Sequence, residues 1–471
     1  MRVKLIAVLL AAGFAMPSAA DDLTTVLAEM KRLSARVEAL EQQNRELEKA
    51  LSTERLSEKE PELATRVKAT ESQTLAMQGP LKKLAEALDG IQVSGSLTSV
   101  LQQVGARDTA SGTGETRASY RGDLTVTLPG GEMGDAEGKI FTHFRLGQGA
   151  GIGLRPTYTS TVNTTAFETN AGPDDSYAIL TQAWYQMKIP LVKDGLKANA
   201  REHLYLTVGK IDPFVFFDQN AAADDETAKF LNNVFVHNPL LDSGGDIQAD
   251  RYGFAPGAIV KYANSSEKGG EWGLSFGAFG SGSGANFTGS LADPLLIAQA
   301  ETAARFNYLP GNYRVYLWNQ GRGIDYDQVE RTHAGFGVSI DQKISGHLTA
   351  FGRYGHQLKG KPRFDRALTA GLELDGSPWS RAADSVGLAF GGLRTGSDFR
   401  RNSPTIDADG DGNPDVGYQA SEWEKDVELY YRYKLNSHVE LTPDFQWIHQ
   451  PGGNAGAPTV KVLGLRAKLG F

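Results

Sequence analysis

The last ten residues of the chain read Val462-Leu463-Gly464-Leu465-Arg466-Ala467-Lys468-Leu469-Gly470-Phe471. Counted from Leu463, every second residue is apolar, whereas Arg466 and Lys468 fall on the other face of an extended strand. One face therefore suits lipid and the other suits water. The chain ends on an aromatic residue, and the same alternation recurs many times upstream. These features predict an all-β fold, a transmembrane antiparallel β-barrel in which lipid-facing and lumen-facing residues alternate.

The N-terminus carries the three parts of a secretory leader. Arg2 and Lys4 are its positive region, residues 5–16 its apolar region and Ser18-Ala19-Ala20 its small-residue cleavage site. We therefore expect residues 1–20 to be a signal peptide. No apolar run of about 20 residues follows, so membrane insertion would need a closed barrel. The chain has no cysteine, which excludes disulfides, thiolate metal sites and a lipid-modified N-terminus.

A different pattern precedes residue 60. Apolar residues from Val26 to Leu51 follow one another at spacings of three and four, interrupted by Asn44. Such a narrow seam is typical of a coiled coil, and a polar residue in it fixes register and oligomer number. We predict an α-helical coiled coil over residues 21–60, in the periplasm and joining a homotrimer, and a helical linker over residues 61–90. A single amphipathic helix lying on the barrel is the alternative.

From residue 91 the period changes from seven residues to two. Similar segments recur to the end of the chain and predict about sixteen strands, so residues 91–471 should form one barrel. Connections alternate in length as well. Long ones (449–459, 395–424, 281–300, 211–251 and 148–177) should lie outside the cell, and short ones (436–437, 341–345 and 309–312) in the periplasm. Only the turn at 190–201 is longer than this rule expects. The pattern predicts that the protein lies in the outer membrane of a Gram-negative bacterium, where the lipid bilayer surrounds the barrel.

Ten side chains are predicted to line the pore, and nine of them are basic. Charged residues belong on the lumen side because the lipid face penalises Arg or Lys by ~2–4 kcal/mol at the midplane. Their position therefore needs no functional explanation, but their bias toward positive charge does, since rings of Arg and Lys select anions. An anion-selective pore is thus one reading of the sequence. The predicted pore-lining residues are Arg121, Arg145, Lys188, Arg314, Trp318, Arg353, Arg432, Lys434, Arg466 and Lys468.

The longest connection, residues 211–251, mixes aromatic and acidic residues. Its Phe214, Phe216 and Phe217 are too apolar for a freely solvated loop, and its carboxylates are too polar for contact with lipid. A loop folded into the barrel suits both kinds of residue, because the aromatic rings can pack on the inner wall while the carboxylates lie beside lumen arginines. An ordinary external loop is the alternative. The residues predicted to constrict the pore are Phe217, Asp218, Asn220, Asp224, Asp225 and Glu226.

Around this connection the chain resembles the carbohydrate-selective porin family (OprB-like). The resemblance rests on Gly209-Lys210, the Phe-Phe-Asp-Gln-Asn run at 216–220, the Asp-Asp-Glu-Thr-x-x-Phe-Leu-Asn run at 224–232, and Tyr252-Gly253-Phe254. It implies a porin for passive diffusion of small polar solutes, carbohydrates foremost. The coiled coil is not part of that barrel pattern, so a structural tether between the outer membrane and the cell wall is a rival reading.

Two further classes of function are disfavoured. The net charge of −8 argues against nucleic-acid binding. The stretch Gly273-Leu274-Ser275-Phe276-Gly277 matches the hydrolase nucleophile pattern, but that motif needs a strand-to-helix turn and no helix follows. We therefore do not expect the protein to be an enzyme.

One acidic stretch has the spacing of a calcium loop. Residues 407–415 read Asp-Ala-Asp-Gly-Asp-Gly-Asn-Pro-Asp, which places oxygen ligands at alternating positions between glycines. The distal glutamate of an EF-hand is missing, because that position is Gln419. A solvated acidic turn is the alternative, and no cofactor is otherwise expected. The candidate calcium ligands are Asp407, Asp409, Asp411, Asn413 and Asp415.

Overall fold

The computed structural model describes residues 31–46 except 33 and 44, and residues 90–106, 112–152, 161–166, 176–191, 200–242, 252–281 and 291–471. The predicted signal peptide, most of the predicted coiled coil and nearly all of the 61–90 linker lie outside these residues. The described part of 31–46 is helical, and Val37 and Leu40 are less exposed than their neighbours in it. The chain divides into a unit up to Val93 and a second unit from Ser94 to Phe471. In the described part of the chain, no helix has the length and apolarity needed to cross a membrane.

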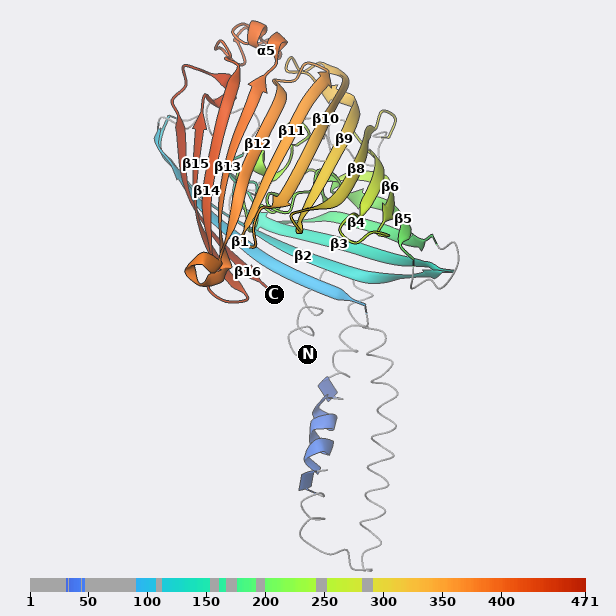
Figure 1. The fold of residues 1–471 in the computed structure, drawn as a ribbon. Helices are drawn as coiled ribbons and strands as arrows, with labels where there is room; N and C mark the ends of the chain where they lie inside the picture. The colour runs from blue at the N-terminus through green and yellow to red at the C-terminus, as the bar shows by residue number, and fades with distance from the viewer. Residues whose placement is uncertain are drawn as a thin grey trace, which may run out of the picture. The chain divides into compact units, whose positions relative to one another are not determined.

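The described residues between Gln92 and Gly470 form a closed antiparallel barrel of 16 strands (Figure 1). Each strand pairs with its neighbours in sequence, and β1 pairs with β16. The predicted barrel and strand number are therefore confirmed. The strands are β1 (Gln92–Val104), β2 (Glu115–Met133), β3 (Ala136–Gln148), β4 (Tyr177–Pro190), β5 (Glu202–Ile211), β6 (Ala255–Asn264), β7 (Trp272–Phe279), β8 (Leu295–Phe306), β9 (Leu309–Ile324), β10 (Glu330–Lys343), β11 (Leu348–Lys359), β12 (Phe364–Gly376), β13 (Arg381–Thr395), β14 (Trp423–Lys434), β15 (Val439–His449) and β16 (Val460–Gly470).

The C-terminal strand closes the barrel. β16 pairs with β1 from Gly470 opposite Ser96 to Val462 opposite Val104. Beyond this register, Gly95 and Phe471 exchange two backbone hydrogen bonds of 3.0 Å. The Phe471 ring lies over Gly95, where a Cβ would come within 2.6 Å of the ring. The aromatic C-terminal residue thus extends the closure, which removes the unpaired edges of an open sheet.

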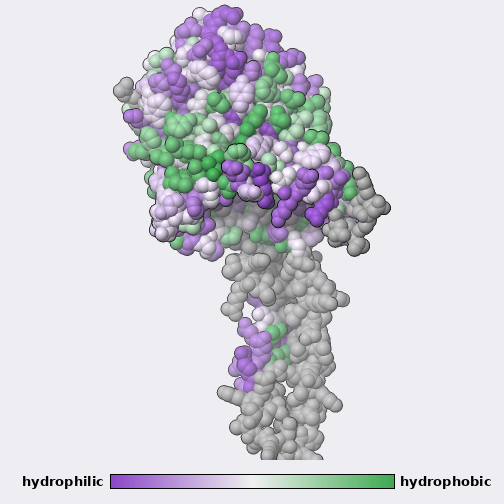
Figure 2. Space-filling model, in the orientation of Figure 1, coloured by the Kyte–Doolittle hydropathy of each residue, from purple (hydrophilic) through white to green (hydrophobic). Residues whose placement is uncertain are grey.

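The two faces of the wall have opposite chemistry. On β16, Leu463 and Leu465 are 60% and 46% exposed, whereas Val462 and Arg466 are 0% and 1% exposed on the inside. Figure 2 shows apolar side chains gathered across the middle of the barrel, with hydrophilic ones above and below. An apolar outer band of this kind suits the hydrocarbon of a bilayer.

Long loops and short turns lie at opposite ends of the strands, which we call the long-loop end and the short-turn end. Both ends of the barrel sequence lie at the short-turn end, because β1 begins opposite the last residues of β16. Three predicted connections have wrong bounds. The turn predicted at 341–345 begins later, because β10 continues to Lys343. The turn predicted at 309–312 consists of Asn307 and Tyr308, whose φ angles of 50° and 65° suit a two-residue hairpin. The loop predicted to reach residue 300 ends earlier, because β8 already begins at Leu295.

Inward-facing glycines make room for aromatic rings on a neighbouring strand. Gly335 and Gly337 of β10 pair with Trp318 and Tyr316 of β9. A Cβ at Gly337 would lie 2.3 Å from the Tyr316 ring, and one at Gly335 would lie 2.1 Å from Trp318. Both rings therefore lie against the wall, where Tyr316 is 1% and Trp318 is 3% exposed.

Replacing Gly337 tests this packing. We expect Gly337→Ala to destabilise the barrel by about 1–3 kcal/mol, because the added methyl group must displace the Tyr316 ring. Urea unfolding in lipid vesicles, followed by tryptophan fluorescence, measures the change. Gly346→Ala is the matched control, since a Cβ there has nothing within 4 Å. Equal stability of the two variants would contradict the packing described.

Candidate pore constriction

Residues 212–242, which we call the inner loop, fold into the barrel and pack with wall residues in its hydrophobic core. Phe217, Phe230 and Phe235 of this loop are each at most 1% exposed. Phe217 meets Phe279 of β7 with ring centroids 6.0 Å apart, and Phe230 meets Tyr430 of β14 at 5.0 Å. The loop therefore packs against opposite parts of the inner wall, which leaves less of the lumen open.

Short capped turns set the path of the inner loop. Asp212 accepts a hydrogen bond from the amide of Phe214 (3.0 Å) and caps the 3₁₀ turn η3 (Pro213–Val215). Asn232 accepts one from the amide of Val234 (3.1 Å) and caps α4 (Asn233–Val236). Asp and Asn are favoured at such positions because their side chains satisfy backbone amides that the turn leaves unpaired.

Asp218 anchors the inner loop to the wall. One carboxylate oxygen accepts hydrogen bonds from the Tyr316 hydroxyl (2.8 Å) and from Nε of Arg353 on β11 (3.2 Å). The other accepts from the amide of Asn238 (2.7 Å), and the Asp218 carbonyl accepts from Nη2 of Arg353 (3.1 Å). The side chains of Asp218 and Arg353 are 0% and 1% exposed. Because both charges are removed from water, the pair depends on these additional hydrogen bonds.

The far part of the inner loop is tied to the opposite wall. Glu226 accepts a hydrogen bond from Nη1 of Arg121 on β2 (2.7 Å). Arg466 of β16 donates to the carbonyls of Glu226 (3.0 Å) and Lys229 (2.7 Å). Glu428 of β14 accepts from the loop amide of Asn232 (2.9 Å). Contacts to β2, β11, β14 and β16 thus carry the loop across the barrel.

The other predicted constriction residues also meet the wall or its charges. The Asn220 amide donates to the Ser339 hydroxyl (3.2 Å) and to the Ile340 carbonyl (3.0 Å) on β10. Asp224 lies 3.7 Å from Nη2 of Arg353, and Asp225 lies 3.9 Å from Nζ of Lys468. The structure therefore brings all six predicted loop residues to the inner wall.

Most of the predicted pore-lining cations have an acidic partner. The N–O distances run from 2.7 to 3.9 Å, and the partners are Asp123 and Glu226 for Arg121, Asp123 for Arg145, Asp341 for Arg314, Asp218 for Arg353, Glu440 for Lys434 and Asp225 for Lys468. Lys188 pairs in register with Glu137 and Tyr205, and Arg432 with Ser385. Arg466 and Trp318 face inward but are 1% and 3% exposed, so neither offers its side chain to a passing solute.

Two carboxylates of the lumen were not predicted from the sequence. Asp341 was expected in a turn, but β10 continues to Lys343 and turns this side chain inward beside Arg314. Glu301 was expected to begin a strand, but it lies well inside β8 and contacts Lys261. The predicted strand ends were wrong by a few residues, so these two acids were not assigned to the lumen. The predicted lumen therefore lacked the carboxylates that balance its cations.

A second loop segment, residues 161–166, also enters the barrel. The Val162 carbonyl accepts hydrogen bonds from the side-chain amides of Gln102 (2.7 Å) and Gln446 (2.8 Å). The Thr164 amide donates to the Leu231 carbonyl of the inner loop (2.9 Å). The segment reads Thr-Val-Asn-Thr-Thr-Ala, in which no hydrophobic period or motif signals this position.

The imidazole of His237 lies between two carboxylates of the inner loop, those of Asp224 and Asp242. Its ring stacks on Phe214 with centroids 3.8 Å apart, and its Nδ1 lies 2.7 Å from Asp242. Its Nε2 lies 3.5 Å from Asp224. Burial alone would lower the pKa of His237, but the hydrogen bond and charge of Asp242, with the charge of Asp224, raise it to about 9. Burial raises the pKa of Asp224 to about 7.

These pKa values predict that alkali loosens the inner loop. The pKa of His237 rises from 6.5 to about 9, so its contribution is complete below pH 6.5 and is lost as the pH rises through 9. That contribution is roughly 3 kcal/mol. Asp224 acts in the same direction, because its raised pKa favours the folded state while it is protonated.

We therefore expect conductance in planar bilayers to rise and become noisier between pH 7 and 10. His237→Gln should remove this pH dependence, whereas His347→Gln, in an exposed pair with Asp375, should keep it. The same pH profile for wild type and His237→Gln would contradict the role of His237.

Loss of Arg353 should release the loop at its anchor. In Arg353→Met the buried carboxylate of Asp218 loses its charged partner, which costs about 3–5 kcal/mol. We expect a higher mean conductance and faster proteolysis within the inner loop. Arg322→Met, which removes an exposed 3.2 Å pair with Glu330, is the control. An Arg353→Met channel with wild-type conductance and protease resistance would show that this pair does not hold the loop.

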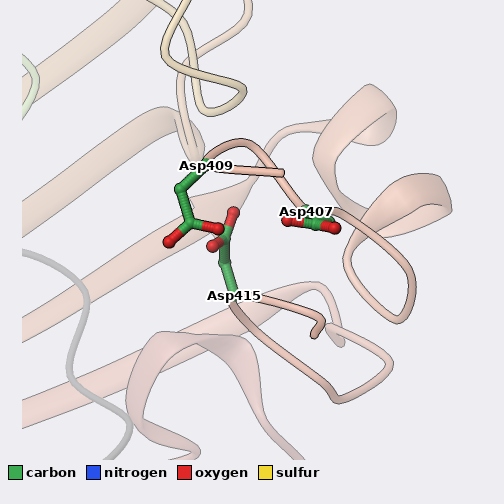
Figure 3. Close-up of side chains that lie close together, drawn as sticks. All are labelled: Asp407, Asp409 and Asp415. Atoms are coloured by element: carbon green, nitrogen blue, oxygen red, sulfur yellow. The ribbon is translucent and has the colours of Figure 1, made fainter. Parts of the chain in front are cut away.

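The predicted calcium ligands lie apart, in the loop between β13 and β14. The carboxylates of Asp407, Asp409 and Asp415 each offer an oxygen within 4.8 Å of the others, and all three are exposed (Figure 3). Asp407 also accepts hydrogen bonds from the amides of Gly410 (2.8 Å) and Gly412 (2.9 Å). Asp411, outside that group, accepts from the amide of Asn413 (2.7 Å). Calcium binding by these residues stays a prediction.

The architecture and sequence also match known proteins. A model of the carbohydrate-selective porin, OprB family, matches residues 142–471. The chain belongs to this family. It is an outer-membrane porin, and both family and fold are those of a channel rather than an enzyme. The resemblance seen around the inner loop is thereby confirmed.

Two curated relatives and one solved structure show how far the similarity extends. The putative porin QuiX of Acinetobacter baylyi is 24% identical over 333 residues, which cover 62% of this chain and 69% of the relative. Porin B of Pseudomonas aeruginosa is 24% identical over 248 residues, 47% of this chain and 54% of that porin, so the match spans about half of its length. The structure of OprB from Pseudomonas putida covers 82% of this chain and 96% of its own, with a TM-score of 0.65 at 17% identity, and it supports the fold alone.

Proposed function

We propose that the protein lets small polar solutes, carbohydrates foremost, diffuse passively through a lumen that the inner loop narrows. The observation that carries this proposal is the loop's attachment to both sides of the barrel, through Asp218 to Arg353 and through Glu226 to Arg121. A wide barrel without such a loop would leave an open aqueous channel. The family description supplies the class of solute. Binding within the pore should be weak, because conduction requires sites that a solute can leave.

The charge balance of the lumen favours neutral solutes over anions. An anion-selective pore needs cations whose charge is not already matched by the protein. Here Arg121 and Arg145 share Asp123, and Arg314 lies 3.2 Å from Asp341. Paired charges still offer hydrogen-bond donors and acceptors to hydroxyl groups, so they suit a sugar better than an inorganic anion.

Removing part of the inner loop tests the constriction. Deleting residues 219–232 removes the contacts of Glu226 and Lys229 with the far wall. We expect a folded barrel with higher conductance and with a weaker block of current by glucose, measured in planar bilayers. Wild-type conductance and wild-type block in the deletion variant would place the loop outside the conduction path. A deletion within 282–290, in another long loop, is the control.

We further propose that the short-turn end faces the periplasm and that the N-terminal segment joins three chains there. The support is the heptad seam, in which Val37 and Leu40 are the less exposed positions of the described helix. Contact with the cell wall, and so a tethering role, would follow from the same placement. Possession of a pore does not exclude that role.

Charges placed in the seam should separate the chains. We expect Val37→Asp with Leu40→Asp to convert a trimer to monomers in mild detergent, because an a/d seam cannot bury carboxylates. Sedimentation velocity measures the change. Ala35→Asp with Ala39→Asp adds the same charge at exposed positions and should leave the trimer intact. A wild-type protein that already sediments as a monomer would refute the coiled coil.

A further inference from the structure

A cavity of about 510 Å³ lies beside the inner loop, toward the short-turn end. Its lining includes Phe216 and Gln219 of the loop, and Tyr205 near the start of β5. The volume falls in the ~300–1,000 Å³ range of small-molecule sites. None of the residues predicted to constrict the pore lines it. We call this cavity the vestibule.

The vestibule combines aromatic rings with a carboxylate held between cations. Phe216 is half-buried and meets Trp184 edge-on, with ring centroids 5.7 Å apart. Glu301 of β8 contacts Nζ of Lys261, accepts a hydrogen bond from the Gln299 amide (3.2 Å), and lies 3.9 Å from Nε of Arg314. Apolar rings beside a few convergent polar groups are the usual composition of a small-molecule site.

The charges of the vestibule balance. Lys261 contacts Glu301, and Arg314 lies 3.2 Å from Asp341 as well as near Glu301. The cavity lining also includes Glu271 but not Asp341, so two cations, Lys261 and Arg314, and two carboxylates, Glu271 and Glu301, line the vestibule. An anionic solute would find no excess positive charge, whereas a hydroxyl group can donate to Glu301 and accept from Lys261 or Arg314.

We propose that the vestibule is a binding site for a neutral monosaccharide, separate from the inner-loop constriction and on its short-turn side. The sugar ring lies against Phe216 and Tyr205, and its hydroxyls bond to Glu301 and its flanking cations. This inference rests on the proposed function, because it concerns the solute that the channel conducts. The vestibule would give the sugar a second binding site beyond the narrow part of the pore. Glu301 would then be the residue responsible for the preference for neutral sugars.

Glu301→Gln tests the assignment, because it keeps the shape of the side chain and removes its charge. Single-channel currents are recorded with D-glucose and, separately, with glucose 6-phosphate. We expect glucose to block the variant about tenfold more weakly than wild type, equivalent to 1.4 kcal/mol. Glucose 6-phosphate should block the variant more strongly, since Lys261 then loses its paired carboxylate while Arg314 keeps its pair with Asp341. Glu330→Gln, which alters an exposed ion pair outside the vestibule, is the control.

A second measurement does not depend on the charge change. Because the chain has no cysteine, Ala263→Cys introduces a unique thiol into the vestibule lining. We expect D-glucose to slow the modification of this thiol by a methanethiosulfonate reagent. The modification rate of a control thiol at Thr127→Cys, on the β2 wall outside the vestibule, should not change with D-glucose. Equal slowing at both positions, or at neither, would overturn the site.

The outcomes separate this inference from the proposed function. If glucose blocks wild type, Glu301→Gln and Glu330→Gln equally, the vestibule is not the binding site, while a carbohydrate porin still stands. If glucose fails to block wild type at all, both proposals fail. Opposite shifts for glucose and glucose 6-phosphate in Glu301→Gln, with thiol protection at Ala263→Cys, would support the neutral-sugar site.

Discussion

The buried pair between Asp218 and Arg353 is the contact on which the path of the inner loop depends. Closing the sheet satisfies the backbone of the wall, but it does nothing to fill a lumen of this width. The loop fills part of it, and its entry is fixed where Asp218, at a left-handed φ of 56°, meets Arg353 and Tyr316. Tyr316 can occupy that position only because Gly337 opposite it has no side chain.

From this anchor, polar contacts and apolar packing reinforce each other. Phe217 and Phe230 bury their rings against β7 and β14, which a solvated loop would not do. The carboxylates between them are then forced toward the wall, where Arg121 and Lys468 meet them. The side of the barrel formed by β4 to β9 keeps its open space, and the balanced charges of Lys261, Glu301 and Arg314 lie there.

The barrel and the position of the inner loop within it could be predicted because they rest on strong local patterns. Alternation such as that from Leu463 to Phe471 requires one lipid face and one aqueous face, and the mixture of Phe217 with Asp218 excludes both free solvent and lipid. The partners across the barrel could not be predicted. Asp218 and Arg353 are 135 residues apart, and register between distant strands decides which side chains meet. Asp341 and Glu301 were missed for a related reason, since alternation locates a strand better than it locates its ends.

The function proposed for the channel depends most on the inner loop lying inside the barrel, and an electron cryomicroscopy map of the full-length protein in lipid nanodiscs tests this directly. We expect continuous density for residues 212–242 within the lumen, with the Asp218 carboxylate in contact with the Arg353 guanidinium. Density for these residues outside the barrel, above an unobstructed lumen, would contradict it.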